Sequence, residues 1–130
     1  MDKGKGKGKG KLWGISGIYL AIVGIIHSAA SIAFTHQVWA GIFADGVFNT
    51  VNVQYDRNAA LFSICFGALL VYTGICWHLQ IRQQQKPLPK FYAWGLLVIA
   101  AVAIVLMPAS GFWLVIPLGL IMLWPHLRKG

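Results

Sequence analysis

Long stretches without a charged residue constrain this chain more than any other feature of its sequence. The first runs from Leu12 to Phe34, and its only titratable side chain is that of His27. A helix needs about 20 mostly apolar residues to cross a hydrocarbon core of about 30 Å. Similar stretches occupy about residues 57–79, 89–107 and 111–127. The sequence therefore predicts an all-α fold, a polytopic transmembrane bundle of four helices in up-down-up-down order, within one domain of residues 12–130.

The segment between His36 and Tyr55 is less apolar than the predicted spans. Its large apolar side chains recur at helical spacing, with polar side chains on the opposite face, as in a helix that lies along a membrane surface. The apolar members are Trp39, Ile42, Phe43, Val47 and Phe48, and the polar ones are Gln37, Asp45 and Asn49. We therefore expect a short interfacial helix on the outer side.

Basic residues give the bundle an orientation. Positive charge collects on the cytoplasmic side of membrane proteins. Only Arg57 falls on the other predicted side from the remaining basic residues, which are Lys3, Lys5, Lys7, Lys9, Lys11, Arg82, Lys86, Lys90, Arg128 and Lys129. We expect a multi-pass protein of a cell inner membrane with both termini in the cytoplasm.

The first 11 residues form a Gly/Lys arm of low complexity. A chain of this composition has almost no apolar surface to bury, which favours a flexible segment. Each basic residue close to an anionic bilayer contributes about 1 kcal/mol of attraction. The predicted partners of Lys3, Lys5, Lys7, Lys9 and Lys11 are anionic lipids of the bilayer, and no specific nucleic acid is expected.

Small residues recur every three or four positions in the first two predicted helices. Such seams allow close packing of helix backbones. The first helix carries Gly17, Ala21, Gly24, Ser28, Ser31 and Thr35, and the second carries Ala60, Ser63, Gly67 and Gly74. Either the two helices pack on each other, or one of the seams supports a homo-oligomer or a membrane complex.

Titratable and polar groups gather at the predicted outer end. Ionisable residues inside membrane helices tend to face the bundle interior and to mark function. The ligand-binding candidates are His27, Asp45, Asn49, Asp56, Arg57 and Trp113. An inward-pointing Arg57 near His27 would make a pocket for an anion or a quinone carbonyl, with the turn at 108–111 as its other wall. Alternatively, His27 bonds a backbone carbonyl or Ser31, and Arg57 forms a helix-end ion pair.

The remaining composition narrows the chemistry. The chain has only three acidic residues and no phosphate-binding loop, nucleophile elbow or metalloprotease motif. Haem ligation needs two imidazoles at one depth, and His27 lacks such a partner. His78 and His126 share a depth, but both lie beside tryptophans at the predicted inner interface, a position typical of histidines that anchor a helix at the membrane surface. We therefore expect no catalytic residue, no metal and no cofactor.

Four features of the sequence match those of a known protein family. These features are His27 late in the first helix, Asp56-Arg57 at the start of the second, Pro87-Leu88-Pro89 followed by Trp94-Gly95, and a Leu-Met-Pro-Ala-Ser-Gly-Phe-Trp motif at 106–113. In these the chain resembles a family of small bacterial four-helix integral membrane proteins defined only as a domain of unknown function. The resemblance implies the fold and no activity.

These observations leave three functions open. A non-catalytic membrane subunit or scaffold is favoured by the small-residue seams, the short loops and the absence of a catalytic set. A small-molecule or ion carrier would use the outer polar pocket around His27 and Arg57. A haem- or quinone-binding redox module is the third alternative.

Overall fold

The computed structural model describes residues 12–128, and within them it contains four α-helices, two short 3-10 helices and no strand. In chain order these are η1 (Leu12–Ile15), α1 (Ser16–Ala44), α2 (Tyr55–Gln84), α3 (Lys90–Leu106), η2 (Gly111–Leu114) and α4 (Val115–Leu127). The prediction of an all-helical fold with four helices is confirmed. The Gly/Lys arm of residues 1–11, with its predicted lipid contacts, lies outside the described residues, as do residues 129 and 130.

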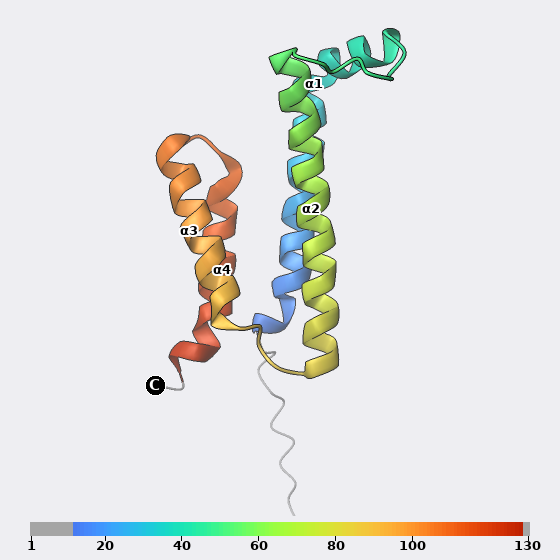
Figure 1. Cartoon of the computed structure of the whole chain (residues 1–130). Helices are drawn as coiled ribbons and strands as arrows, with labels where there is room; N and C mark the ends of the chain where they lie inside the picture. The colour runs from blue at the N-terminus through green and yellow to red at the C-terminus, as the bar shows by residue number, and fades with distance from the viewer. Residues whose placement is uncertain (1–11, 129–130) are drawn as a thin grey trace, which may run out of the picture.

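The helices form two antiparallel hairpins (Figure 1). Helix α1 packs along α2, α3 packs along α4, and α4 also contacts α1. At 1.5 Å per residue, α2 is about 45 Å long and α3 about 26 Å. The α1–α2 hairpin therefore extends well beyond the end of the α3–α4 hairpin (Figure 1).

Several helix ends differ from the sequence prediction, and the first predicted helix, 12–34, begins as the 3-10 turn η1 before α1. Helix α2 continues to Gln84, beyond the predicted end at residue 79, and stops at Gln85, whose φ of 52° is left-handed. The sequence prediction ended this helix where the polar residues begin. Polar residues can continue a helix beyond its apolar part, and they do so here as far as Gln84. The fourth predicted helix, 111–127, begins as the 3-10 turn η2 before α4.

Helix α1 is bent at Thr35. The backbone there has non-helical angles, φ −116° and ψ 19°, and Thr35 Oγ1 donates to the carbonyl of Ser31 at 2.6 Å. A Thr side chain that bonds the carbonyl four residues earlier often bends a helix. Residues 36–44 consequently leave the axis of α1 as a short helical arm (Figure 1). The sequence predicted a short helix in this region, but a turn over 45–54 replaces its second half.

The small-residue seams of α1 and α2 face each other. A Cβ built at Gly24 would lie 2.8 Å from the backbone N of Val71 and 2.9 Å from the carbonyl O of Gly67. A Cβ at Gly74 would lie 2.5 Å from the backbone N of Ala21. The two backbones approach so closely that no side chain fits between them at these positions. The seams therefore serve packing within one chain.

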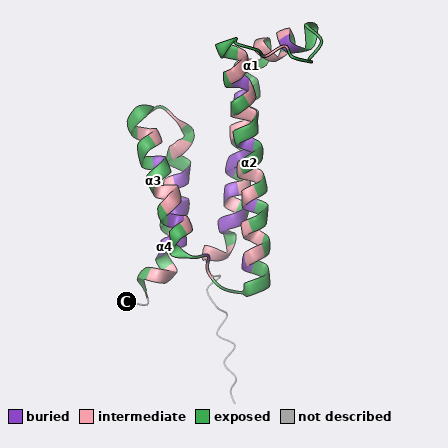
Figure 2. Cartoon of the chain, viewed as in Figure 1, coloured by how far each residue is buried: buried purple, intermediate pink, exposed green. Residues whose placement is uncertain are grey.

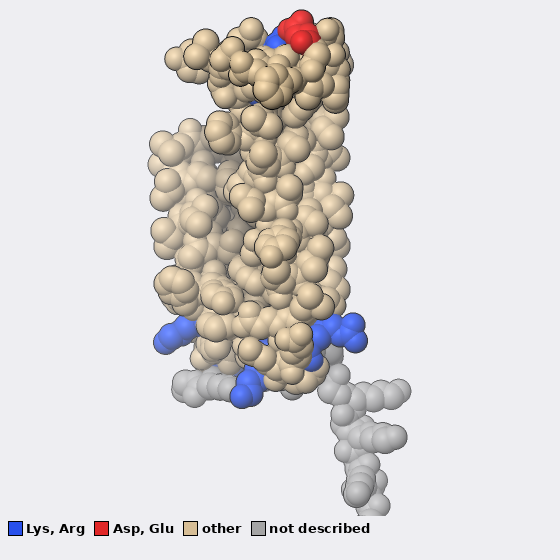
Figure 3. Space-filling view, turned by 45° about the vertical axis from the view of Figure 1, so that its right-hand side comes forward, with Lys and Arg blue, Asp and Glu red and all other residues tan. Residues whose placement is uncertain are grey.

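Apolar and charged residues are sorted along the length of the molecule. Buried residues run along the inner sides of the hairpins (Figure 2). Many large apolar side chains are exposed. The charged residues among 12–128 lie at the two ends, with a charge-free band between them (Figure 3). The basic end carries Arg82, Lys86, Lys90 and Arg128, and the opposite end carries Asp45, Asp56 and Arg57.

Two helical segments, Leu12–Ala44 and Tyr55–Gln84, are long and apolar enough to cross a membrane. Only 22% and 17% of the residues in their most apolar windows are buried, so most of their apolar side chains face outward. Shorter apolar helices occupy Lys90–Leu106 and Gly111–Leu127.

Candidate functional site

A groove lies between the two hairpins, in the half of the molecule nearer the 45–54 turn. Its volume is about 570 Å³, within the range of about 300–1,000 Å³ typical of small-molecule sites. Helices α1 and α2 form one wall, and α3, the turn at 107–110 and η2 form the other. The space-filling view shows the molecule hollowed between the hairpins (Figure 3). The predicted turn therefore does stand opposite His27.

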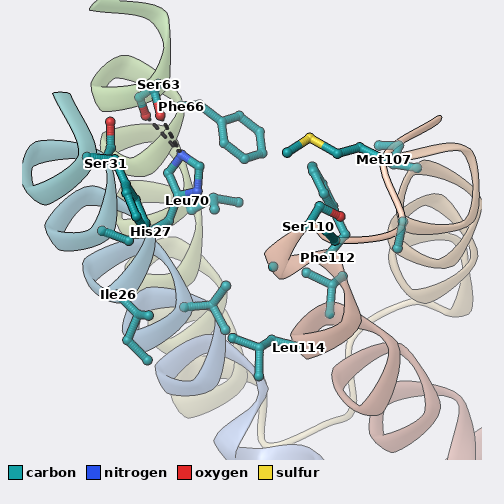
Figure 4. Close-up of a pocket in the computed structure, with 18 of the residues that line it drawn as sticks. Ile26, His27, Ser31, Ser63, Phe66, Leu70, Met107, Ser110, Phe112 and Leu114 are labelled. Atoms are coloured by element: carbon teal, nitrogen blue, oxygen red, sulfur yellow. Dashed lines mark hydrogen bonds between the residues drawn. The ribbon is translucent and has the colours of Figure 1, made fainter. Parts of the chain in front are cut away.

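His27 is the one titratable side chain among the residues that line this groove. Its Nε2 lies 3.1 Å from the Ser63 carbonyl oxygen and 3.1 Å from Ser63 Oγ, across the α1–α2 contact (Figure 4). A carbonyl oxygen only accepts hydrogen bonds. A hydrogen bond from His27 to this carbonyl places the proton on Nε2, which in a neutral imidazole leaves the lone pair on Nδ1.

This tautomer decides what the His27–Ser63 pair does. A histidine that activates a serine must accept the hydroxyl proton on its unprotonated nitrogen. The nitrogen nearest Ser63 Oγ is the one that donates to the Ser63 carbonyl, so it has no free lone pair. The arrangement holds the imidazole ring in place and does not prepare a nucleophile.

Two serine hydroxyls beside the groove have no partner. Ser31 Oγ and Ser110 Oγ are buried and make no hydrogen bond within the described residues, although both residues line the groove. The sequence offered a backbone carbonyl or Ser31 as the alternative partner for His27, and the structure has a backbone carbonyl, that of Ser63. Buried hydroxyls without partners are uncommon in folded proteins.

Arg57 does not join His27. Its Nη2 donates to Asp45 Oδ2 at 2.6 Å and its Nη1 donates to the Thr50 carbonyl at 2.7 Å. The Arg57 side chain is 12% exposed, whereas that of Asp45 is 57% exposed. Arg57 thus ties the start of α2 to the end of the α1 arm and to the turn. This is the helix-end ion pair considered as the alternative from the sequence.

The other predicted site residues also lie apart from the groove. Asp56 Oδ1 accepts from the backbone N–H of Arg57 at 2.8 Å, at the start of α2. Asn49 is exposed in the turn, with a left-handed φ of 53°. Trp113 is 57% exposed, and its Nε1–H donates to the carbonyl of Pro108 at 2.8 Å. Of the six predicted residues, only His27 lines the groove.

Sequence reasoning missed the aromatic lining. Phe66 packs edge-on against His27, with ring centroids 5.3 Å apart, and Phe112 of η2 lies 6.2 Å from Phe66. Ser63 and Phe66 are three residues apart and so share a helix face, which is a signal that the sequence contained. Phe112 belongs to the other hairpin, and no local pattern indicates that it meets Phe66.

The residues that line the groove are mostly apolar. Among residues 12–128, no group of three His, Cys, Asp or Glu side chains is placed to hold a metal ion. No Lys, Arg, Asp or Glu side chain of the described part of the chain lines the groove. What it provides is a large apolar surface with an imidazole and a few hydroxyl groups.

A comparison with known protein families assigns the chain to a family for which no activity is described. A family model described as a family of unknown function, DUF6463, matches residues 11–129. The chain belongs to this DUF6463 family. The match covers all six predicted site residues as well as both walls of the groove. No curated protein and no solved structure matches the chain.

Proposed function

We propose that this member of the DUF6463 family is an integral membrane protein that binds a small apolar molecule in the groove between its hairpins. The membrane part of the proposal is supported by the charge-free band, whose outward-facing side chains are apolar. In water such a surface would be far larger than the few hundred Å² of contiguous apolar patch found on soluble monomers. In a bilayer it faces lipid tails.

In the proposed topology the chain crosses the cell inner membrane four times, and both termini lie in the cytoplasm. Its support is the separation of charge, with Arg82, Lys86, Lys90 and Arg128 at one end. Helix α3 has 17 residues, at the lower limit of about 17–25 for a membrane span. The arm of α1 then lies along the outer surface, and the groove opens toward the outer half of the bilayer.

The groove itself is the observation that favours ligand binding over a scaffold role. A scaffold needs only exterior faces, whereas this chain forms a groove of about 570 Å³ that is lined by apolar side chains with an imidazole and a few hydroxyl groups, as small-molecule sites are. The small-residue seam, which first suggested assembly with a partner, is used within the chain. Any homo-oligomer or membrane complex would use another face.

Groove filling tests this function. Ala30 lies exposed on the groove wall, while Ala101 lies exposed on α3 and does not line the groove. Ala30→Trp and Ala101→Trp therefore add the same side chain inside and outside the groove. Purified protein in lipid nanodiscs is dialysed to equilibrium against 1-methoxynaphthalene, with empty nanodiscs of the same lipid measuring partition.

We expect one saturable site in the wild type and in Ala101→Trp, and loss of that site in Ala30→Trp. Two results would refute the proposal: no saturable binding above that of empty nanodiscs, or equal binding by both tryptophan variants.

A further inference from the structure

His27 offers a ligand in the groove a hydrogen-bond acceptor. Since Nε2–H of His27 is held by Ser63, its Nδ1 carries the lone pair and has no hydrogen-bond partner among the described residues. Nδ1 is not among the fully buried partnerless atoms, unlike Ser31 Oγ and Ser110 Oγ, so part of it is exposed on a side chain that lines the groove. Figure 4 shows one ring nitrogen turned to Ser63 and the other turned away from it. A ligand that meets Nδ1 must donate a hydrogen bond to it.

Aromatic rings surround this acceptor. His27, Phe66 and Phe112 form a continuous series, with centroid distances of 5.3 Å and 6.2 Å and interplanar angles of 81° and 42°. Tilted and edge-to-face pairs at about 4.5–7 Å are the favoured geometry of aromatic side chains. An aromatic ring of a ligand bound in the groove would extend this series, and a substituent on that ring would meet Nδ1 of His27.

The charge of the ligand is also limited. None of the charged side chains among residues 12–128 lines the groove, and Arg57, a candidate from the sequence, is engaged by Asp45 and the Thr50 carbonyl. A carboxylate or an amine buried here would have no counter-ion, which makes binding of its charged form costly. The ligand is therefore neutral.

We propose that the groove selects neutral lipid-soluble molecules that carry a hydroxylated aromatic ring, with the phenolic O–H donating to His27 Nδ1 and the ring packing against Phe66 and Phe112. This inference rests on the proposed function, because it specifies the head group of the molecule that the groove binds.

Three probes of similar size separate the parts of the proposal. 1-Naphthol has the aromatic ring and the O–H donor, 1-methoxynaphthalene has the ring without the donor, and 1-decalol has a hydroxyl on a saturated ring. Their saturable binding to wild-type protein is measured in nanodiscs by equilibrium dialysis. We expect 1-naphthol to bind roughly threefold to tenfold more tightly than 1-methoxynaphthalene, the ratio that one net hydrogen bond provides. We expect 1-decalol to bind more weakly than 1-naphthol by a similar factor, because it lacks the ring contacts.

Matched histidine variants assign the donor preference to one atom. His27→Phe keeps an aromatic ring and removes Nδ1, so 1-naphthol should bind no more tightly than 1-methoxynaphthalene. His36 lies exposed on the α1 arm, with Nδ1 within 2.9 Å of the carbonyl of Ala33, and His36→Phe should keep the wild-type ratio. If His27→Phe does not fold, the binding of the three probes to the wild-type protein still tests whether the groove prefers a hydroxylated aromatic ring.

Each failure points to a different claim. Equal saturable binding of 1-naphthol and 1-methoxynaphthalene would overturn the hydroxyl recognition while leaving the ligand-binding groove in place. Binding of 1-decalol as tight as that of 1-naphthol would overturn the aromatic part. If none of the probes binds saturably, the proposed function fails and the head-group inference fails with it.

Discussion

Two glycines in helix interiors, Gly74 in α2 and Gly95 in α3, separate close helix packing from intrinsic helix propensity. A Cβ at Gly74 would lie 2.5 Å from the backbone N of Ala21 and 2.6 Å from the carbonyl O of Gly17, whereas a Cβ at Gly95 meets nothing within 4 Å. Backbone atoms cannot rotate away as a side chain can. To bring the Gly74 contact to the 3.4 Å of ordinary van der Waals contact, α1 and α2 must separate locally by about 0.9 Å.

The expected magnitudes follow from these contacts. Replacing a helical glycine by alanine stabilises a helix by about 0.5–1 kcal/mol when the site has room, which is the whole effect expected for Gly95→Ala. Overpacking costs about 1–3 kcal/mol, and rigid backbone neighbours place Gly74→Ala in the upper part of that range. The net loss for Gly74→Ala is about 1–2 kcal/mol, and the two variants should differ by about 2–3 kcal/mol.

Equilibrium unfolding measures this difference. Each variant is titrated with sodium dodecyl sulfate in mixed micelles, and helix content is followed by far-ultraviolet circular dichroism. If Gly74→Ala is as stable as Gly95→Ala, the close α1–α2 contact described above does not exist in the folded protein.

Three further predictions concern single side chains. Asp45→Asn removes the charge that Arg57 meets; because Asp45 is 57% exposed, the free energy of unfolding should fall by about 1 kcal/mol or less, and a loss of several kcal/mol in the same titration would contradict a surface ion pair. Nitrogen-15 NMR of histidine-labelled protein at neutral pH should show His27 with a protonated Nε2 and an unprotonated Nδ1, and the reverse assignment would remove the basis of the ligand inference. Cys65 lies exposed within the charge-free band, so a sulfonated maleimide should modify it only after the membrane is dissolved; modification in intact vesicles would contradict its contact with lipid.

Hydropathy and small-residue spacing predicted most of the fold. Four apolar segments became four helices, and the facing seams of Gly17 and Gly74 were visible because helix packing has a local period. The bend at Thr35 fell where the apolar stretch stopped. Exact helix ends were less predictable, since the polar end of α2 stays helical as far as Gln84.

The site was only partly predictable. His27 stood out because an imidazole inside a long apolar stretch is costly without a partner. Asp45 and Arg57 were grouped with it by predicted depth, but depth does not tell which way a side chain points, and Arg57 points to the turn. Phe112 and Ser110 reach the groove only through the docking of the second hairpin on the first. That docking is a tertiary feature without a local signal in the sequence.

The central claim is that both hairpins cross a membrane, and labelling of single cysteines tests it most directly. In a background with Cys65→Ala and Cys76→Ala, a cysteine is placed at Phe48, which is 92% exposed in the 45–54 turn, at Gln84, or at Gly111, where a Cβ meets nothing within 4 Å. In sealed right-side-out vesicles, an impermeant maleimide should reach Phe48→Cys and Gly111→Cys, and should reach Gln84→Cys only after the vesicles are permeabilised. Labelling of Gly111→Cys and Gln84→Cys from the same side would show that the α3–α4 hairpin does not span the membrane, and would contradict the account.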